Sequence, residues 1–256
     1  MIADYLRYKW KAVNAHGIHS PFVYELATKV LYDKTHFADY EKVTGLKWKM
    51  RQDLSPITFT EYGAGKPGEH ILPVGTIARR SAVSQKYGRL LFRLVRWFQP
   101  TTVIELGTSL GIGTSWLASG LGSEGHIHTF EGCLPVAEKA AKNFEDLKLK
   151  EQIDIHVGPI ENTLPLVLKD LPQPDFAYMD ANHRLAPTLN YFNTLIEKAH
   201  SHTVFVLDDI YWSAEMKEAW RILKDDKRVS LSIDLHQFGL VFLLENRAKE
   251  HFIVRF

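Results

Sequence analysis

The feature that most constrains the fold of this chain is the segment from Thr102 to Gly120. An apolar run, Thr102–Leu106, carries the acid Glu105 next to its end and reads as a buried strand. Glycines then recur at positions 107, 111 and 113, and a helical pattern follows. Glycines let the backbone turn sharply and approach a ligand closely, and a helix start offers free N–H groups. The segment predicts a nucleotide-type pocket at the end of a parallel strand.

The same alternation of strand and helix continues to the end of the chain. Strands are expected at Thr102–Leu106, His126–Phe130, Ile153–Val157, Phe176–Met179, Thr203–Leu207, Ser230–Leu235 and Leu240–Leu244, the last two as an antiparallel pair. Helices are expected at Lys86–Phe98, Gly113–Gly120, Pro135–Leu147, Glu161–Lys169, Pro187–Ala199 and Ala214–Lys224. This order predicts an α/β, doubly wound, Rossmann-like sheet of seven mostly parallel strands with an antiparallel C-terminal strand. The apolar tail His251–Phe256 reads as a strand end.

Residues 1–79 lack this alternation and are expected to form a mainly helical N-terminal cap, with residues 80–256 as the α/β domain. Ser20 and Pro21 look like an N-cap and a first-turn proline of a helix reaching Leu31. The stretch from Thr58 to Thr76 is rich in glycine and proline, so it is expected to be irregular.

Composition narrows the function classes. The formal net charge of the 256 residues is +1, so no global field draws the protein to nucleic acid or to a membrane. The single Cys133 excludes an internal disulfide framework. No apolar run approaches the roughly 18 residues of a membrane span, and the first residues lack a signal-peptide layout. A cytoplasmic protein is expected. The oligomeric state stays open, with a homodimer as one option.

Acidic residues stand where the expected strands end. Because the carboxyl ends of parallel strands share one edge of a sheet, these side chains should meet around one ligand. The positions are Glu105, Glu131, Glu161 (preceded by Gly158), Asp180, Asp208 and Asp209. An acid after the second strand can accept hydrogen bonds from both ribose hydroxyls of a nucleoside, in NAD enzymes as in others, so Glu131 alone does not name the ligand.

The spacing of the glycines separates two ligand classes. Dinucleotide sites favour G-x-G-x-x-G, in which the helix start lies against a pyrophosphate. This chain has G-x-x-x-G-x-G, with Ser109 where the second glycine of the dinucleotide pattern would stand. S-adenosylmethionine has no pyrophosphate, so the looser loop suits it.

With these residues in view, the chain resembles the class I S-adenosylmethionine-dependent methyltransferases, and is most similar to the catechol and caffeoyl-CoA type O-methyltransferases. The resemblance covers about Val83–Leu244. It rests on ordered blocks: Lys86-Tyr87-Gly88-Arg89, Val103–Gly113, Thr129-Phe130-Glu131, Val157-Gly158 with Glu161, Phe176–Asp180, and Val206-Leu207-Asp208-Asp209.

The resemblance implies roles for particular residues. Residues 80–256 would be the S-adenosylmethionine-binding methyltransferase domain. The cofactor would contact Val83, Glu105, Gly107, Thr108, Ser109, Gly111, Gly113, Glu131, Gly158, Glu161 and Asp180. A Mg²⁺ ion would be held by Asp180, Asp208 and Asp209 and would activate an acceptor hydroxyl. Asp180 and His183 would be catalytic, with His183 as a general base of ordinary pKa near ~6.5.

Two departures from the family pattern bear on these roles. The family has Asp-Asn where this chain has Asp208-Asp209, and often a catalytic Lys where this chain has His183. A small-molecule acceptor is favoured. The alternatives are a tRNA-modifying methyltransferase that uses the basic and aromatic N-terminal residues, an NAD(P)-dependent dehydrogenase, and a non-catalytic binding protein on the same fold.

Overall fold

The computed structural model describes residues 2–62, 65 and 68–256. The chain divides into two compact units. The central unit comprises Thr35–Pro172, and the terminal unit comprises the residues up to Lys34 together with Gln173–Phe256. The predicted boundary between a cap and an α/β domain at residue 79 stays a prediction. In the part of the chain that the structure describes, no helix is long and apolar enough to cross a membrane.

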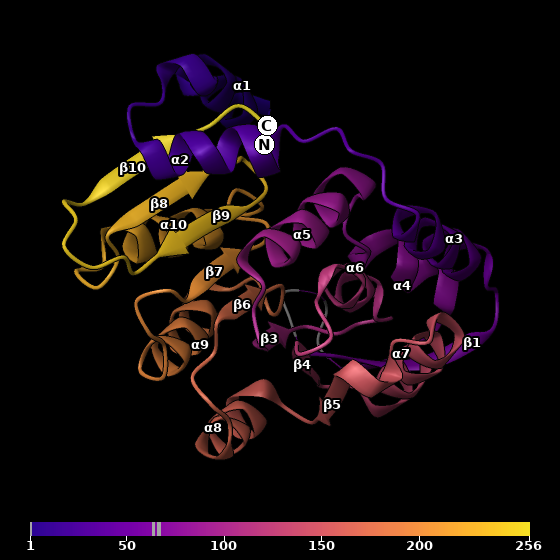
Figure 1. Cartoon of the computed structure of the whole chain (residues 1–256). Helices are drawn as coiled ribbons and strands as arrows, with labels where there is room; N and C mark the ends of the chain where they lie inside the picture. Colours follow the sequence, from indigo (N-terminus) through magenta and orange to yellow (C-terminus); the bar gives the residue numbers. More distant parts are fainter. Residues whose placement is uncertain (1, 63–64, 66–67) are drawn as a thin grey trace. The chain divides into compact units, whose positions relative to one another are not determined.

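The central unit contains three parallel strands in the order β3 (Thr102–Leu106), β4 (His126–Glu131) and β5 (Ile153–Val157). Every residue of β3 is buried, which explains its nearly continuous apolar sequence. The helices of this part are α5 (Gln85–Phe98), α6 (Ile112–Gly120), α7 (Leu134–Leu147) and α8 (Ile160–Asp170), with a short 3₁₀ turn at Lys150–Gln152 (Figure 1).

Helix α5 lies against α6 because one residue of α5 has no side chain. A Cβ atom on Gly88 would stand 2.3 Å from Nε1 of Trp116 on α6, closer than any real contact. The side chain of Ser84 caps the start of α5 by accepting a hydrogen bond from the backbone N–H of Tyr87. Helix α6, which begins directly after the glycine-rich turn, is therefore held by close packing.

The first part of the central unit differs from the sequence prediction. It consists of α3 (Asp39–Gln52), the strands β1 (Pro56–Glu61) and β2 (Gly68–Pro73), and α4 (Val74–Ser81). The expectation of irregular chain was wrong for residues 58–61 and 68–76, because β1 and β2 form an antiparallel pair in which Phe59 faces His70 and α4 begins at Val74. Residues 63, 64, 66 and 67 of the same predicted stretch lie outside the described residues. The glycines and prolines of the segment favoured an irregular chain, but Ile57, Thr58 and Phe59 are residue types common in strands, and pairing between β1 and β2 satisfies the backbone groups.

The terminal unit holds the remaining strands. Their order is β10 (Glu250–Ile253), β8 (Leu231–Asp234), β9 (Gly239–Phe242), β7 (Val204–Leu207) and β6 (Phe176–Met179). Strand β9 is antiparallel to both of its neighbours, as predicted, whereas β6 pairs with β7 in parallel. The tail strand β10 pairs in parallel with β8 and is one strand more than the seven predicted.

Helices cover both faces of these strands. They are α1 (Ile2–Lys11), a 3₁₀ turn at Ala15–Gly17, α2 (Pro21–Leu26) continuing as a π turn over Ala27–Leu31, α9 (Leu185–Ile196) and α10 (Ala214–Asp225). In Figure 1, α2 crosses in front of β8 and β9 while α10 lies behind them. Phe22 of α2 meets Phe242 edge-on at 5.2 Å, and Trp220 of α10 packs on Gly239.

Candidate active site

The glycine-rich turn of the central unit has the backbone that its sequence predicted. Gly107, Ser109 and Gly111 all lie in the left-handed region, with φ of 99°, 48° and 77°. The N–H groups of Gly107 and Thr108 both donate to the carbonyl of Phe130, at 3.0 and 3.1 Å. These bonds fix the turn to the end of β4. Because Gly107 and Gly111 have no side chains, the backbone of the turn can adopt these angles just before α6 begins.

Glu131, the last residue of β4, is joined to this turn. Its Oε2 accepts a hydrogen bond from the backbone N–H of Ser109 at 2.8 Å, and its Oε1 accepts one from Cys133 N–H at 2.9 Å. The first bond also stabilises the left-handed backbone of Ser109, a conformation that non-glycine residues rarely adopt. The structure thus brings together the predicted acid and the predicted loop, 22 residues apart in sequence.

Glu105 has a different place from the one expected of a ligand contact. Its side chain is fully buried. Its Oε2 accepts hydrogen bonds from the hydroxyls of Thr114 and Thr129 at 2.5 and 2.6 Å, and the Thr129 hydroxyl also lies 2.6 Å from that of Thr108. This network ties the turn to α6 and β4. The side chain of Glu105 therefore positions the loop, and a direct cofactor contact stays a prediction.

The other predicted cofactor residues of the central unit are more dispersed. Gly158, with φ of 132°, donates its N–H to the Glu131 carbonyl at 2.9 Å, which joins the ends of β4 and β5. Glu161 is exposed in the first turn of α8. Val83 is buried, and its carbonyl accepts a hydrogen bond from the Lys47 ammonium. Gly113 lies within the first turn of α6.

Two residues beside the loop were missed by the sequence reasoning. The hydroxyl of Ser81, at the end of α4, lies 2.7 Å from that of Ser109. A Cβ atom on Gly132 would stand 2.6 Å from the ring of Tyr62, so this half-exposed tyrosine lies directly against the residue after Glu131. Neither position carries a local signal, because both depend on how the segment around β1 and β2 folds back on β4.

The terminal unit carries the second group of predicted residues. Asp180 directly follows β6 and Asp208 directly follows β7, and the parallel register pairs Met179 with Leu207. The hydroxyl of Tyr178 lies between them, 2.8 Å from Oδ2 of Asp208 and 3.1 Å from Oδ2 of Asp180. Tyr178 was not predicted as a site residue. The sequence could have indicated Tyr178, because it stands two residues before Asp180 and alternate residues of a strand point to the same face.

The carboxyls of this group lie in a poorly solvated place. Asp208 is 3% exposed, and burial, together with the charges of Asp180 and Asp209, raises its pKa well above the ordinary range. Its Oδ1 accepts hydrogen bonds from Gln237 Nε2 at 3.0 Å and from Asp209 N–H at 2.6 Å. Burial also raises the pKa of Asp209, and the neighbouring His183 opposes that rise. The group thus concentrates negative charge that a cation would stabilise.

His183 lies beside Asp180, with its Nε2 3.4 Å from Oδ1. Burial lowers the pKa of His183, but the hydrogen bond to Asp180 and the charges of the three aspartates outweigh burial and raise it to about 9. The expectation of an ordinary pKa near ~6.5 was therefore wrong, since the acids act together on the ring. At neutral pH the ring carries a proton and a positive charge.

The three aspartates Asp180, Asp208 and Asp209 have the right ligand atoms for Mg²⁺, but these atoms are not arranged around a common point. Asp180, Asp208 and Asp209 offer the oxygen ligands that a hard cation prefers. In the described residues, however, their ligand atoms do not gather within 4.8 Å of one another, as they would around an ion. Binding would need rotation of these side chains toward a common point.

Comparisons with known proteins agree with this fold and these motifs. Residues 104–210 match the family model described as a methyltransferase domain. The chain is 33% identical over 131 residues to a catechol O-methyltransferase from Mycobacterium tuberculosis, a match that covers 51% of this chain and 58% of that protein. The chain thus spans little more than half the length of this curated relative.

Solved structures extend the likeness over most of the chain. An O-methyltransferase from Bacillus cereus in complex with SAH has a TM-score of 0.61 at 19% identity, covering 84% of this chain and 94% of that one. An SAH-bound methyltransferase from Podospora anserina has a TM-score of 0.62 at 12% identity, covering 89% and 98%.

The fold is therefore the α/β Rossmann-like methyltransferase fold, with mostly parallel strands, antiparallel C-terminal strands and N-terminal helices, as predicted. Within this fold class, the chain is similar over about half of its length to a catechol O-methyltransferase, and residues 104–210 match the methyltransferase-domain model.

Proposed function

We propose that this protein is an S-adenosylmethionine-dependent O-methyltransferase that acts on a small hydroxylated acceptor. The observation that carries the proposal is the bond between Glu131 and the N–H of Ser109 in the left-handed glycine turn. It supports a nucleoside site in which an acid and a close-approaching backbone act together. The relative named catechol O-methyltransferase supports the choice of reaction and acceptor.

The central unit would bind the methyl donor. Gly107 and Gly111 let the backbone approach the ligand, and the N–H groups at the start of α6 stay available to it. The Glu131 carboxylate, already oriented by two backbone N–H groups, would accept hydrogen bonds from the ribose hydroxyls. Gly158 and Glu161 would flank the adenine.

The terminal unit would handle the acceptor. In methyl transfer the acceptor oxygen attacks the sulfonium methyl group in line, a C–O bond forms, the S–C bond breaks, and the hydroxyl proton must leave. Protonated His183 would hold the oxygen as it becomes negative, and the Asp180 carboxylate beside it would accept the proton. If the three aspartates held a Mg²⁺ ion instead, the ion would lower the pKa of the acceptor hydroxyl in place of the protonated ring, because its charge would also oppose the rise in the pKa of His183.

Calorimetry tests the donor site. We expect S-adenosylhomocysteine to bind and NAD to bind far more weakly. Glu131→Gln should weaken S-adenosylhomocysteine binding by about 10- to 100-fold, since hydrogen bonds to a charged group contribute roughly 1.5–3 kcal/mol. Glu124→Gln is the matched control, because Glu124 is exposed in the turn before β4. Tighter binding of NAD, or a Glu131→Gln variant with unchanged affinity, would refute the donor assignment.

Two variants of His183 test whether a positive charge is needed at this position. His183→Lys keeps a positive charge and should retain far more methylation of a catechol than His183→Gln, which we expect to lose about 10²–10⁴-fold in kcat. The opposite order would show that the reaction does not need a positive charge at residue 183. Dialysis against EDTA tests the metal, and full activity in the chelated enzyme would remove Mg²⁺ from the mechanism.

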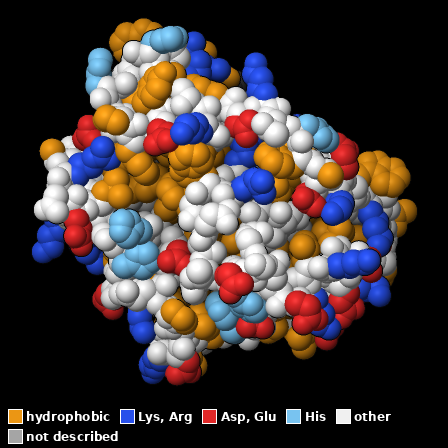
Figure 2. Space-filling view, viewed as in Figure 1, with side chains coloured by type: hydrophobic (Ala, Val, Ile, Leu, Met, Phe, Trp, Pro, Cys, Tyr) orange, Lys and Arg blue, Asp and Glu red, His pale blue; other side chains and the backbone are white. Residues whose placement is uncertain are grey.

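The tRNA-modifying alternative has one structural candidate. A pocket of the central unit is lined in part by Lys47, Arg51, Arg79 and the exposed Trp48. The ammonium of Lys47 already donates to the carbonyls of residues 82 and 83, and Arg79 donates to the Arg51 carbonyl. On the face drawn in Figure 2, basic side chains are interspersed with acidic ones. These features favour a small acceptor, and tight, salt-sensitive tRNA binding would reverse that preference.

A further inference from the structure

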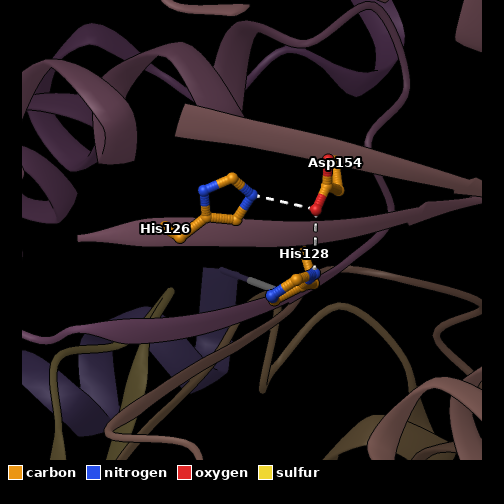
Figure 3. A group of neighbouring side chains, drawn as sticks. All are labelled: His126, His128 and Asp154. Carbon is orange, nitrogen blue, oxygen red and sulfur yellow. Dashed lines mark hydrogen bonds and ion pairs between the residues drawn. The ribbon is translucent and has the colours of Figure 1, made fainter. Parts of the chain in front are cut away.

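A separate cluster of side chains lies in the central unit at the start of two strands, not at their ends. His126 is the first residue of β4, and His128 follows two positions later on the same face. Asp154, the second residue of β5, is the register partner of His128. Figure 3 shows the three side chains turned toward one another across the two strands.

The distances suit a bound ion. Oδ2 of Asp154 lies 2.9 Å from Nε2 of His126 and 3.6 Å from Nδ1 of His128, and one ligand atom from each residue lies within 4.8 Å of the others. Ligand atoms on a tetrahedral zinc ion stand about 3.3 Å apart, since zinc–nitrogen bonds are about 2.0–2.1 Å long. The measured separations bracket that value. Among the described residues, no other group of three His, Cys, Asp or Glu gathers this closely.

The donor types select the metal. Two imidazoles and one carboxylate suit zinc and its neighbours, whereas Mg²⁺ prefers oxygen ligands throughout. The Asp154 side chain is 57% exposed, which leaves the cluster open to ions from solution.

We propose that His126, His128 and Asp154 bind a divalent late transition metal of the Zn²⁺ type. Nε2 of His156 lies 3.3 Å from Nδ1 of His128, within reach of the fourth position. Glu131, at the other end of β4, stands five residues beyond His126 and three beyond His128, which is about 16 Å and about 10 Å in an extended strand. The ion therefore lies apart from the proposed donor site. It fastens β4 to β5 and stabilises the central unit.

Calorimetry with ZnCl₂ on the untagged, EDTA-dialysed full chain at pH 7 tests the proposal, since a histidine tag would itself bind the metal. We expect one tight equivalent of Zn²⁺. Asp154→Asn and His126→Gln should each weaken binding at least tenfold. Asp154→Asn is the safer variant, because its half-exposed side chain is not needed for packing. Bound Co²⁺ should give the visible spectrum of a tetrahedral site in the unmutated protein and lose it in Asp154→Asn.

His200→Gln is the matched control. Nε2 of His200 lies 3.0 Å from Oδ1 of Asp175, which resembles the His126–Asp154 contact, but no third His, Cys, Asp or Glu among the described residues joins that pair. The variant should bind Zn²⁺ as the unmutated protein does. At a free Zn²⁺ concentration one hundred times Kd, the unfolding temperature of the unmutated protein and of His200→Gln should rise by on the order of 5 °C. The rise should be much smaller in Asp154→Asn.

Three results would overturn the proposal. They are no Zn²⁺ binding by the unmutated chain, equal affinity and Co²⁺ spectra in Asp154→Asn and His126→Gln, or binding that survives both variants and is lost in Asp209→Asn. The last result would assign the ion to the aspartates of the terminal unit. All readouts are independent of methyl transfer, so they stand whether or not the proposed activity is found.

Discussion

The same substitution, glycine to alanine, should have opposite effects at Gly111 and Gly45. At Gly111 φ is +77°, and an L-residue in this left-handed region costs roughly 1–2 kcal/mol. The new Cβ would stand 2.4 and 2.7 Å from Cε1 and Cζ of Phe144, a ring that is 1% exposed. Moving a buried ring costs about 1–3 kcal/mol. Gly111→Ala should therefore lower the free energy of unfolding by about 2–5 kcal/mol.

Gly45 offers the matched control. It lies exposed within α3, and a Cβ there would meet no atom within 4 Å. Gly45→Ala should raise the free energy of unfolding by about 0.5–1 kcal/mol, because alanine loses less backbone entropy in a helix. Equilibrium unfolding in urea, followed by circular dichroism, measures both variants.

Binding of S-adenosylhomocysteine links the stability effect to the site. A shifted turn at Gly111 also moves the N–H of Ser109 that orients Glu131, so the Gly111→Ala protein should bind the ligand more weakly even where it is fully folded. Gly45→Ala should bind it normally. A Gly111→Ala variant within about 0.5 kcal/mol of the unmutated protein, which is the range of neutral surface changes, would refute the assigned turn geometry.

Two further perturbations test other contacts. The hydrogen bond from Lys139, together with those from Ser55, lowers the pKa of Asp53 from 3.8 to about 2. The ionised Asp53 therefore stabilises the fold fully above pH 4, and this contribution is lost as the pH falls through 2. Asp53→Asn should lower the free energy of unfolding by about 2 kcal/mol at pH 7, and the difference should shrink from pH 4 downward in pH-dependent urea unfolding. Tyr178→Phe should lower the free energy of unfolding by about 1–3 kcal/mol, because buried Asp208 loses a hydrogen-bond donor. If the hydroxyl also positions Asp180, the variant should lower kcat more than it raises KM. Unchanged stability would contradict the first expectation, and unchanged kcat the second.

Much of the architecture was readable from local pattern. The strands β3, β5 and β6 begin and end where the apolar runs do, and the other predicted strands agree within two residues. Every residue of β3 and of β6 is buried, so the mostly apolar composition of these two strands reflects burial on both faces of a sheet. The hairpin of β1 and β2 left no such record, since its residues face solvent in part and are held by mutual pairing.

The sequence by itself determined the strand–turn–helix unit, the glycines that need left-handed backbone, and the acids at the strand ends, because these follow from spacing along the chain. Only the tertiary structure decided what those acids do. It buried Glu105 among threonines, oriented Glu131 on the turn, and surrounded His183 with carboxylates that raise its pKa. It also placed Asp154 beside His126 and His128. Burial and charge at a side chain are set by neighbours from distant segments, and spacing along one chain does not contain them.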